Sequence, residues 1–166
     1  EEFISRLKKL EKICPHFHLS LQSGCNETLA RMNRKYSVEE FRKVVERVRK
    51  TFEDAILTTD IIVGFPGETE EDFEDTLDVV DKIKFDQVFM FIYSRRKGTV
   101  ADKMENQIPE DIKHKRFDRL KALVESQIEE NNSKYIGTIQ KVLIDGTSKT
   151  NENKRCSNIW TIFNSE

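Results

Sequence analysis

The sequence predicts an α/β fold with parallel strands, and two observations carry this prediction. Strand-like runs at residues 16–23, 56–63 and 87–94 alternate with segments in which apolar residues recur at helical spacing. Each intervening helical segment is long enough to return the chain to the same side of a sheet, so consecutive strands should run parallel. We therefore expect an open or barrel-type α/β sheet.

Composition limits the broad class of protein. The 166 residues are 37% hydrophobic and 35% charged, with a formal net charge of −2, which fits one domain with a small appendage and a heavily charged surface. The total charge does not call for nucleic acid, yet it leaves room for a local basic site. No apolar run reaches about 18 residues and no signal peptide opens the chain, so we expect a cytoplasmic protein without a membrane partner.

The cysteines and the first residue add two expectations. Cys14, Cys25 and Cys156 are widely spaced and odd in number, which argues against a disulfide framework and against a zinc site. The sequence begins with Glu1, inside a helical pattern, and not with Met, so we expect a fragment of a longer protein.

The first half of the chain reads as follows. Residues 1–12 are typical of the end of a helix, and 16–23 alternate apolar and polar positions as in a strand with one polar face. A short helix capped by Asn26 should come next. Ser37 and Glu40 form a capping box that opens a helix to about Phe52, because each side chain meets a free backbone N–H of the first turn.

The stretch "TTDIIVGFPGETEEDF" combines a strand, a turn and a helix start. Residues 56–63 are the strand, and Thr69 is the expected N-cap of the next helix. The acids at 70–72 would meet the positive end of the helix dipole, worth ~0.3–1 kcal/mol each. We therefore interpret these carboxylates as helix-starting residues.

The later elements are predicted in the same way. The run "QVFMFIYS" at 87–94 is nearly all apolar, which predicts a strand covered on both faces. Pro109 opens a long helix to about Asn131. Residues 138–148 read as a strand and a turn, and 151–166 as either a second strand or a poorly ordered end.

Ligands of parallel α/β sheets bind beyond the carboxyl ends of the strands. Three such ends occur here, at residues 22–24, 64–68 and 93–99. Gly64 and Gly67 would let the backbone approach a ligand or turn with positive φ, and Pro66 would stiffen the turn between them. A tight turn without a ligand is the alternative.

Charged side chains near these ends suggest further roles. Arg31 and Arg34 follow the first strand, and Arg95 to Lys97 follow the third, so together they would form a positive patch for RNA phosphates, or else remain solvated loops. Asp60 lies in an apolar strand and needs hydrogen-bond partners if it points inward. His18 is interpreted as a packing histidine.

Several blocks of this sequence resemble a known family. "HLSLQSGCNETLARMNRKYS", "TTDIIVGFPGETEEDF" and "FIYSRRKGTVADKM" are similar to successive blocks of the radical S-adenosylmethionine (SAM) tRNA methylthiotransferases. The helix from Pro109 and "KYIGTIQKVLIDG" resemble the bridge of that family into its C-terminal TRAM domain, a small RNA-binding β barrel. The resemblance runs from about Cys14 to Ser148, and the order of the blocks makes it specific.

The resemblance implies a fold and an activity. Residues 1–132 would be the C-terminal part of a radical SAM α/β barrel, and 133–166 a truncated TRAM-like β segment. The expected fold class is then an incomplete parallel β/α barrel whose long C-terminal helix leads into a truncated small β unit. The family binds S-adenosylmethionine and [4Fe–4S] clusters, and adds a methylthio group to a hypermodified adenosine next to the anticodon of tRNA.

The resemblance also implies site residues. Gln22 and Ser23 would help hold the nucleoside part of the cofactor, and Tyr93 would lie near its adenine. Lys141 lies where the RNA-binding barrel begins. The candidate cofactor-binding residues are Gln22, Ser23, Asp60, Ile62, Gly64, Pro66 and Tyr93. The candidate tRNA contacts are Arg31, Arg34, Arg95, Arg96, Lys97 and Lys141.

The sequence departs from the family in its cysteines. It has neither the CxxxCxxC triplet nor the three further cysteines that hold the two clusters, and Fe–S ligation in this superfamily requires thiolates. We therefore assign no metal ligand and no catalytic residue, and expect the chain to be inactive alone. A non-enzymatic RNA-binding module and a barrel enzyme of phosphate sugars remain alternatives. The block "HFHLSLQSGC" resembles the branch that acts on threonylcarbamoyl-adenosine, whereas "FMFIYSRRKGT" resembles the branch that acts on isopentenyl-adenosine. The choice between the two substrates therefore stays open.

Overall fold

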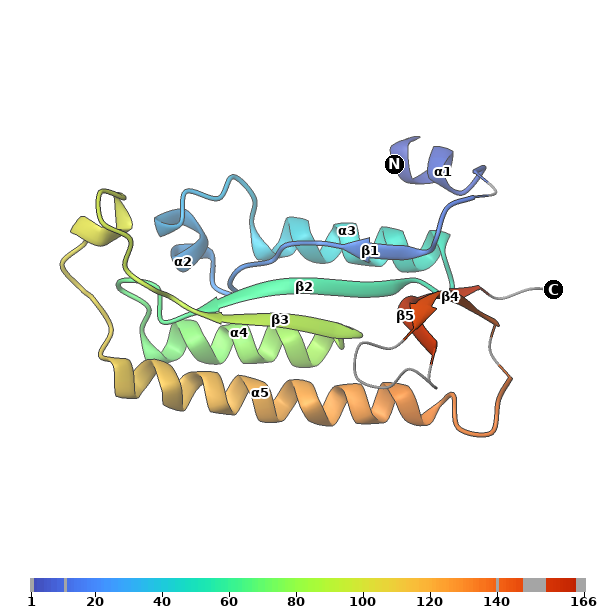
Figure 1. The fold of residues 1–166 in the computed structure, drawn as a ribbon. Coiled ribbons are helices and arrows are strands. Elements are labelled where there is room, and N and C mark those ends of the chain that lie inside the picture. The colour runs from blue at the N-terminus through green and yellow to red at the C-terminus, as the bar shows by residue number, and fades with distance from the viewer. Residues whose placement is uncertain (1, 11, 140, 148–154, 164–166) are drawn as a thin grey trace.

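The computed structural model describes residues 2–10, 12–139, 141–147 and 155–163, and for the last two ranges only the course of the backbone. Figure 1 shows a small sheet flanked by long helices. In the described part of the chain, no helix combines the length and the apolar character that a membrane span requires.

The main sheet has three parallel strands in the order β1-β2-β3, which confirms the predicted parallel arrangement. The strands are β1 (His16–His18), β2 (Ile56–Val63) and β3 (Gln87–Ile92). The register pairs Asp60 with Phe89 and Ile62 with Phe91, so β2 and β3 run level to their carboxyl ends.

The first strand is shorter than the predicted run 16–23. Beyond His18 the chain still follows β2, with the Leu19 N–H donating to Thr58 O and an isolated bridge joining Gln22 to Ile61. Gln22 has φ 68, a left-handed conformation that a regular ladder does not accommodate. The prediction of one continuous strand is therefore wrong at this residue.

The helices lie along the sheet in Figure 1. Their bounds are α1 (Glu2–Leu7), α2 (Asn26–Arg31), α3 (Val38–Thr51), α4 (Glu70–Ile83) and α5 (Glu110–Ser133), and a 3₁₀ turn, η1, spans Ala101–Lys103. The apolar stripe of α3 packs on the core side of β2, where Leu57, Ile61 and Val63 are at most 1% exposed. Helices α4 and α5 contribute Phe73, Val80, Leu120 and Val124 to the same core.

The predicted caps are confirmed with one exception. Ser37 and Glu40 form the capping box of α3, and Thr69 and Asp72 form that of α4. Helix α2 is capped by Cys25 and not by Asn26, which is already its first helical residue. The Asn26 amide instead accepts a hydrogen bond from the Val38 N–H at 2.8 Å, so it joins α2 to the start of α3.

The prediction that β3 is covered on both faces is wrong. Val88 is buried against the helices, whereas its neighbours Phe89 and Phe91 are 40% and 52% exposed. We call the second face of the sheet, which carries these two rings, the open face. Within the described residues no helix covers it, so its apolar side chains do not mark a two-sided core.

The C-terminal elements form a separate sheet. Strands β4 (Lys141–Thr147) and β5 (Arg155–Phe163) pair antiparallel with each other, in agreement with the predicted strand near 138–148. The fold class is confirmed as an α/β arrangement with a parallel sheet, a long helix α5 and a small β unit after it. The side chains of Lys141 and Cys156 lie outside the described residues.

Candidate functional site

The structure brings the three predicted strand ends together. The Gln22 N–H donates to Asp60 O at 2.7 Å, the Ile62 N–H donates to Gln22 O at 2.9 Å, and the Tyr93 N–H donates to Val63 O at 2.8 Å. Since Gly64 follows Val63 directly, Gln22, Gly64 and Tyr93 lie at one end of the sheet. We call this end, formed by residues 22–24, 64–68 and 93, the rim.

A cavity of about 400 Å³ opens between the ends of β2 and β3 and the loop that follows β3. Most of its wall is apolar or aromatic, and it includes two candidate cofactor residues, Ile62 and Tyr93. The Tyr93 hydroxyl is buried and has no hydrogen-bond partner among the described residues. An apolar and aromatic wall suits a ligand that has a flat ring. The lining residues are Ile62, Phe65, Phe91, Ile92, Tyr93, Ser94, Arg96, Thr99 and Ala101.

The two glycines of the turn are needed for its shape. Gly64 and Gly67 have φ +76 and +79, which other residues adopt only with strain. A Cβ on Gly64 would lie 2.4 Å from Lys113 Cγ, and one on Gly67 would lie 3.3 Å from Arg31 Cδ. The space beside each glycine is thus taken by a side chain of this chain, which favours the tight-turn interpretation. Pro66 between them is buried.

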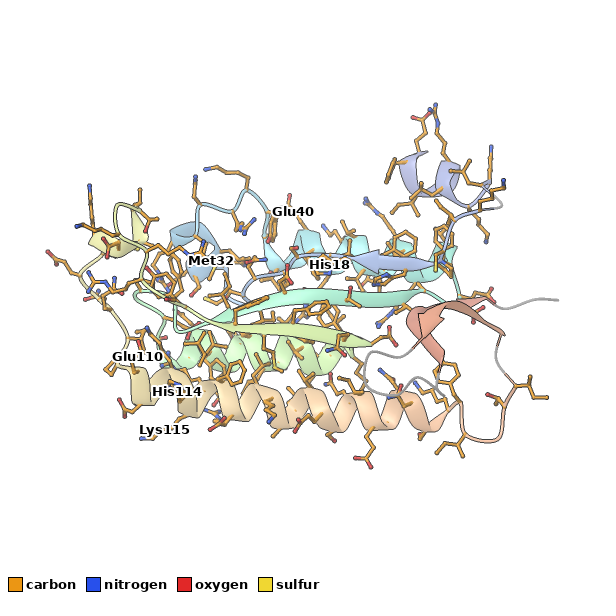
Figure 2. The ribbon with its side chains drawn as sticks, in the orientation of Figure 1. His18, Met32, Glu40, Glu110, His114 and Lys115 are labelled. Atoms are coloured by element: carbon orange, nitrogen blue, oxygen red, sulfur yellow. The ribbon has the colours of Figure 1, made fainter. Side chains whose placement is uncertain are left out.

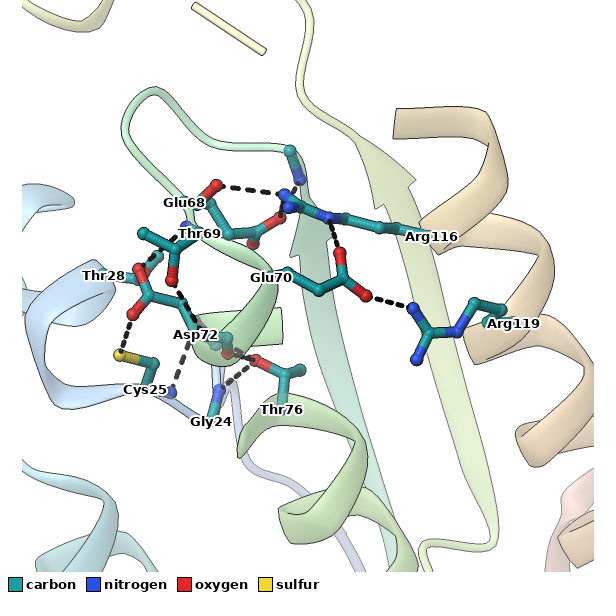
Figure 3. Close-up of polar contacts among 12 residues, drawn as sticks. Gly24, Cys25, Thr28, Glu68, Thr69, Glu70, Asp72, Thr76, Arg116 and Arg119 are labelled. Carbon is teal, nitrogen blue, oxygen red and sulfur yellow. Dashed lines mark hydrogen bonds and ion pairs between the residues drawn. The ribbon is translucent and has the colours of Figure 1, made fainter. Parts of the chain in front are cut away.

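The acidic residues after this turn do more than start a helix, as Figure 3 shows. The Glu68 side chain is buried, and its Oε2 accepts hydrogen bonds from the Gly64 N–H at 2.9 Å and from Arg116 Nη1 at 3.0 Å. Burial raises the pKa of Glu68, although the Gly64 N–H and Arg116 oppose this shift. Glu68 therefore closes the turn by bonding back to its first residue.

Asp72 connects α4 to α2. Its carboxylate accepts hydrogen bonds from Cys25 Sγ and Thr28 Oγ1, each at 3.2 Å, and forms an ion pair with Arg31. Burial alone would raise the pKa of Asp72, but these donors and the Thr69 N–H together lower it. The interpretation of this acid as a helix-starting residue is correct but incomplete.

Ser23 and Gly24 belong to the same junction. The Ser23 side chain is buried, with its Oγ 3.3 Å from Thr76 Oγ1, and the Gly24 N–H donates to Thr76 Oγ1 at 2.9 Å. A Cβ on Gly24 would lie 2.5 Å from the Cα of Thr76, so the backbone of the rim rests directly on α4. The structure thus assigns the Ser23 hydroxyl to packing contacts within the chain.

On the open face, next to the rim, polar side chains of β1 and β2 form a hydrogen-bonded network. Asp60 Oδ2 lies 3.1 Å from His18 Nε2 and accepts a hydrogen bond from Ser20 Oγ at 3.1 Å. His18 Nδ1 and His16 Nε2 each lie 3.0 Å from Thr58 Oγ1. Figure 2 marks His18 on β1. Asp60 has the partners that the sequence required of it. His18 has a partner for each ring nitrogen and packs against the Phe89 ring, which agrees with its interpretation as a packing histidine.

Sequence reasoning assigned no role to Thr58 or Ser20. The signal that could have found Ser20 is the period-two alternation of residues 16–23, which places it on the polar face with His18. The signal for Thr58 is its place two residues before Asp60 in a strand.

The basic residues differ in their availability. Arg95 donates to Asp102 Oδ1 at 3.1 Å, and the Arg31 side chain is only 29% exposed beside Asp72. Arg34, Arg96 and Lys97 are exposed. The loops after α2 and after β3 both lie at the rim end of the molecule in Figure 1.

The described residues do not bring together the donor set of an iron–sulfur cluster. Cys14 and Cys25 are not joined in a disulfide, and burial raises the pKa of Cys25. Over the described ranges, no three His, Cys, Asp or Glu side chains converge so that they could hold a metal ion. The sequence contains no CxxxCxxC triplet.

A parallel sheet with helices along one face and a cavity at its carboxyl ends is the arrangement of α/β enzymes that bind their ligands at the strand ends. The comparisons with known proteins narrow this class. The model of the radical SAM superfamily matches residues 1–80. The sequence is 52% identical over 151 residues to the tRNA-2-methylthio-N(6)-dimethylallyladenosine synthase of Caldicellulosiruptor saccharolyticus, covering 91% of this chain and 32% of that protein. The resemblance to the radical SAM tRNA methylthiotransferases is thereby confirmed.

Two further comparisons agree with this result. The synthase of the same name from Clostridium botulinum strain Eklund 17B is 50% identical over 153 residues, which cover 92% of this chain and 34% of that protein. The chain thus spans about a third of the length of the curated relatives it matches. The fold resembles that of coproporphyrinogen III oxidase from Escherichia coli, described as a radical SAM enzyme, with a TM-score of 0.65 over 76% of this chain and 29% of that chain. At 19% identity this likeness concerns the fold alone.

Proposed function

We propose that this chain is part of a tRNA methylthiotransferase that adds a methylthio group to a hypermodified adenosine next to the anticodon by radical SAM chemistry. The observation that carries the proposal is the rim. Two of the sequence blocks that resemble the family contain Gln22–Gly24 and Gly64–Glu68, and a third contains Tyr93. In the fold these segments lie at one end of the sheet, where Phe65 and Tyr93 line the cavity. The share of identical residues with the named synthases supports the same function.

The rim residues suit S-adenosylmethionine. Ile62, Phe65 and the ring of Tyr93 would form an apolar and aromatic wall for the adenine. Gln22, Gly64, Pro66 and Asp60 would shape the floor, and Ser23 would support it from below. Bound S-adenosylmethionine supplies the radical chemistry of the family. The cluster ligands are not in this chain, so we expect it to be inactive alone.

The tRNA would approach at the rim end. Arg34, Arg96 and Lys97 are the exposed cations that would meet its phosphates, while Arg31 and Arg95 already pair with Asp72 and Asp102. Lys141 would contribute from the TRAM-like part. The names of the relatives favour the isopentenyl (dimethylallyl) adenosine branch over the threonylcarbamoyl branch.

The two expected parts of the chain are part of this proposal. Residues 1–132 would be the barrel part and 133–166 the TRAM-like part, and the separate β4-β5 sheet supports this division. A tRNA-modifying role also supports the cytoplasmic location.

A chimera tests the proposal. This chain would replace the matching third of the Caldicellulosiruptor saccharolyticus synthase, and methylthio-modified nucleosides in hydrolysed tRNA would be measured by mass spectrometry. We expect the chimera to form the product and the isolated chain to form none. Changing Tyr93→Ala should raise the KM for S-adenosylmethionine, because the aromatic part of the cavity wall is lost. A folded chimera that binds iron and cofactor but forms no product would contradict the proposal.

The RNA-binding alternative is separated by a second measurement. The exposed Arg34, Arg96 and Lys97 favour some binding of tRNA by the chain itself, with an affinity that falls as salt rises. An inactive chimera combined with salt-sensitive tRNA binding would favour the non-enzymatic module. The barrel enzyme of phosphate sugars is less favoured, because the Lys113 and Arg31 side chains occupy the space beside Gly64 and Gly67.

A further inference from the structure

The start of α5 reaches the rim through two buried cations. Lys113 is 2% exposed and Arg116 is 6% exposed. Long charged side chains are almost never fully buried unless they are paired, so their burial needs a cause. Both residues lie on the face of α5 that meets the ends of β2 and β3.

Lys113 connects α5 to the end of β3. Its Nζ donates to Tyr93 O at 3.1 Å and to Glu110 Oε1 at 2.7 Å. Its carbon chain lies against Gly64, where any larger residue would displace it. One side chain therefore contacts both strand ends that border the cavity.

Arg116 connects α5 to the turn after β2, as Figure 3 shows. Its Nη1 donates to Glu68 O and to Glu68 Oε2, each at 3.0 Å, and its Nε donates to Glu70 Oε2 at 3.0 Å. Because Glu68 Oε2 also accepts the Gly64 N–H, Arg116 and Gly64 share one carboxylate oxygen. The contact with Arg116 thus fixes both ends of the turn.

These bonds end on the backbone of the rim. Tyr93 O and Glu68 O are main-chain atoms, and Gly64 is held through its N–H. A buried ion pair adds little net stability, because desolvation offsets the attraction between its charges. Fixed backbone positions matter more at a ligand site, where displacements of about 1 Å can cost roughly a hundredfold in rate.

We infer that Lys113 and Arg116 are positioning residues of the rim. They act through the Tyr93 carbonyl and the Gly64–Glu68 turn and set the distance between the two walls of the cavity. The inference rests on the proposed function as far as the ligand is a nucleoside, whereas the positioning of the backbone can be measured without any ligand.

The first test measures amide hydrogen exchange in the full chain without ligand. Lys113→Met keeps the carbon stem beside Gly64 and removes the ammonium group, and Arg116→Lys keeps the charge but loses the two-pronged contact. Arg119→Met is the matched control. Arg119 lies about one helical turn after Arg116 on α5, is exposed, and pairs with Glu70 and Glu74. We expect exchange at Gly64 and Tyr93 to rise about tenfold in the first two variants only. An equal rise at residues 41–48 of α3 would show general destabilisation and overturn the inference.

The second test uses the same variants in the chimera. We expect Lys113→Met and Arg116→Lys to raise the KM for S-adenosylmethionine about tenfold with a smaller change in kcat, and Arg119→Met to change neither. An unchanged KM with a lowered melting temperature, or an equal effect of Arg119→Met, would overturn the inference. If the unchanged chimera binds no cofactor, the proposed function fails, and the exchange measurement still decides about positioning.

Discussion

Single residues show how this chain joins its layers. The Asp72 carboxylate caps α4, pairs with Arg31 and accepts the Cys25 thiol, so one side chain joins α4 to α2. Because its folded-state pKa lies below the usual value near 3.9, the ionised side chain stabilises the fold at neutral pH. This stabilisation is lost as the pH falls from about 4 through the lowered folded-state pKa.

The change Asp72→Asn should therefore lower the free energy of unfolding by about 1–3 kcal/mol at neutral pH. The difference between the unchanged chain and the variant should shrink as the pH falls toward about 2. Urea unfolding followed by circular dichroism at several pH values measures both effects. Asp75→Asn, an exposed acid on the same helix, is the control and should change little. A difference that stays constant with pH would contradict this account of Asp72.

A second residue-scale prediction concerns Gly24. A Cβ there would meet the Cα of Thr76 at 2.5 Å and the Asp75 carbonyl oxygen at 2.8 Å, and neither backbone atom can move aside cheaply. Gly24→Ala should cost about 1–3 kcal/mol of unfolding free energy. Thermal melting measures this cost, and an unchanged melting temperature would show that α4 shifts freely.

At the scale of elements, the two faces of β3 behave differently. Val88 is 1% exposed and faces the helices, whereas Phe89 is 40% exposed and pairs in register with Asp60. The sequence alone could not tell the buried face of β3 from its exposed face. Both faces carry apolar residues, so the sequence shows no alternation of apolar and polar positions. What the run "QVFMFI" does predict is a strand.

This asymmetry can be measured with one substitution on each face. Val88→Asn should cost at least about 3 kcal/mol, because an amide without partners would be buried. Phe89→Asn should cost about 1 kcal/mol and reduce self-association of the chain, because it removes an exposed ring. Urea unfolding and sedimentation velocity measure the two quantities. Equal costs would mean that the open face is covered in solution.

The elements were more predictable than the contacts between them. The capping motifs of α3 and α4 and the parallel order of the strands are local or combinatorial properties, and both were predicted correctly. The Lys113 and Arg116 contacts join residues 20 and 48 positions apart, to Tyr93 and Glu68, and no short-range pattern indicates which cation will be buried. The interruption of strand pairing at Gln22 was not predicted either, because it depends on the φ angle of that one residue.

For the whole molecule, the central question is whether the parts fold together. Strands β4 and β5 pair with each other and, over the ranges that the structure describes, with no strand of the parallel sheet. Among the strands that the structure describes, β1 and β3 are the two edges of the parallel sheet, and each pairs there only with β2. An unpaired strand edge can accept a further strand.

Removal of residues 134–166 should leave the unfolding free energy of the remaining chain within about 0.5 kcal/mol of its original value. The reason is that the core of the α/β part draws on α3, α4, α5 and the parallel sheet. Chemical unfolding of the full and shortened chains tests this expectation. A loss of more than about 2 kcal/mol would show that the β unit belongs to the same cooperative fold.

The left-handed backbone of Gln22 limits how far the alternation of strand faces can be followed along this sequence. A residue other than glycine pays about 1–2 kcal/mol for that conformation, and its bonds to Asp60 and Ile62 hold it there. The left-handed backbone at this one residue redirects the chain away from the regular strand. After Gln22, the alternation of odd and even positions no longer tells which face of the sheet a side chain occupies. Glycine at this position would adopt the same conformation with less strain.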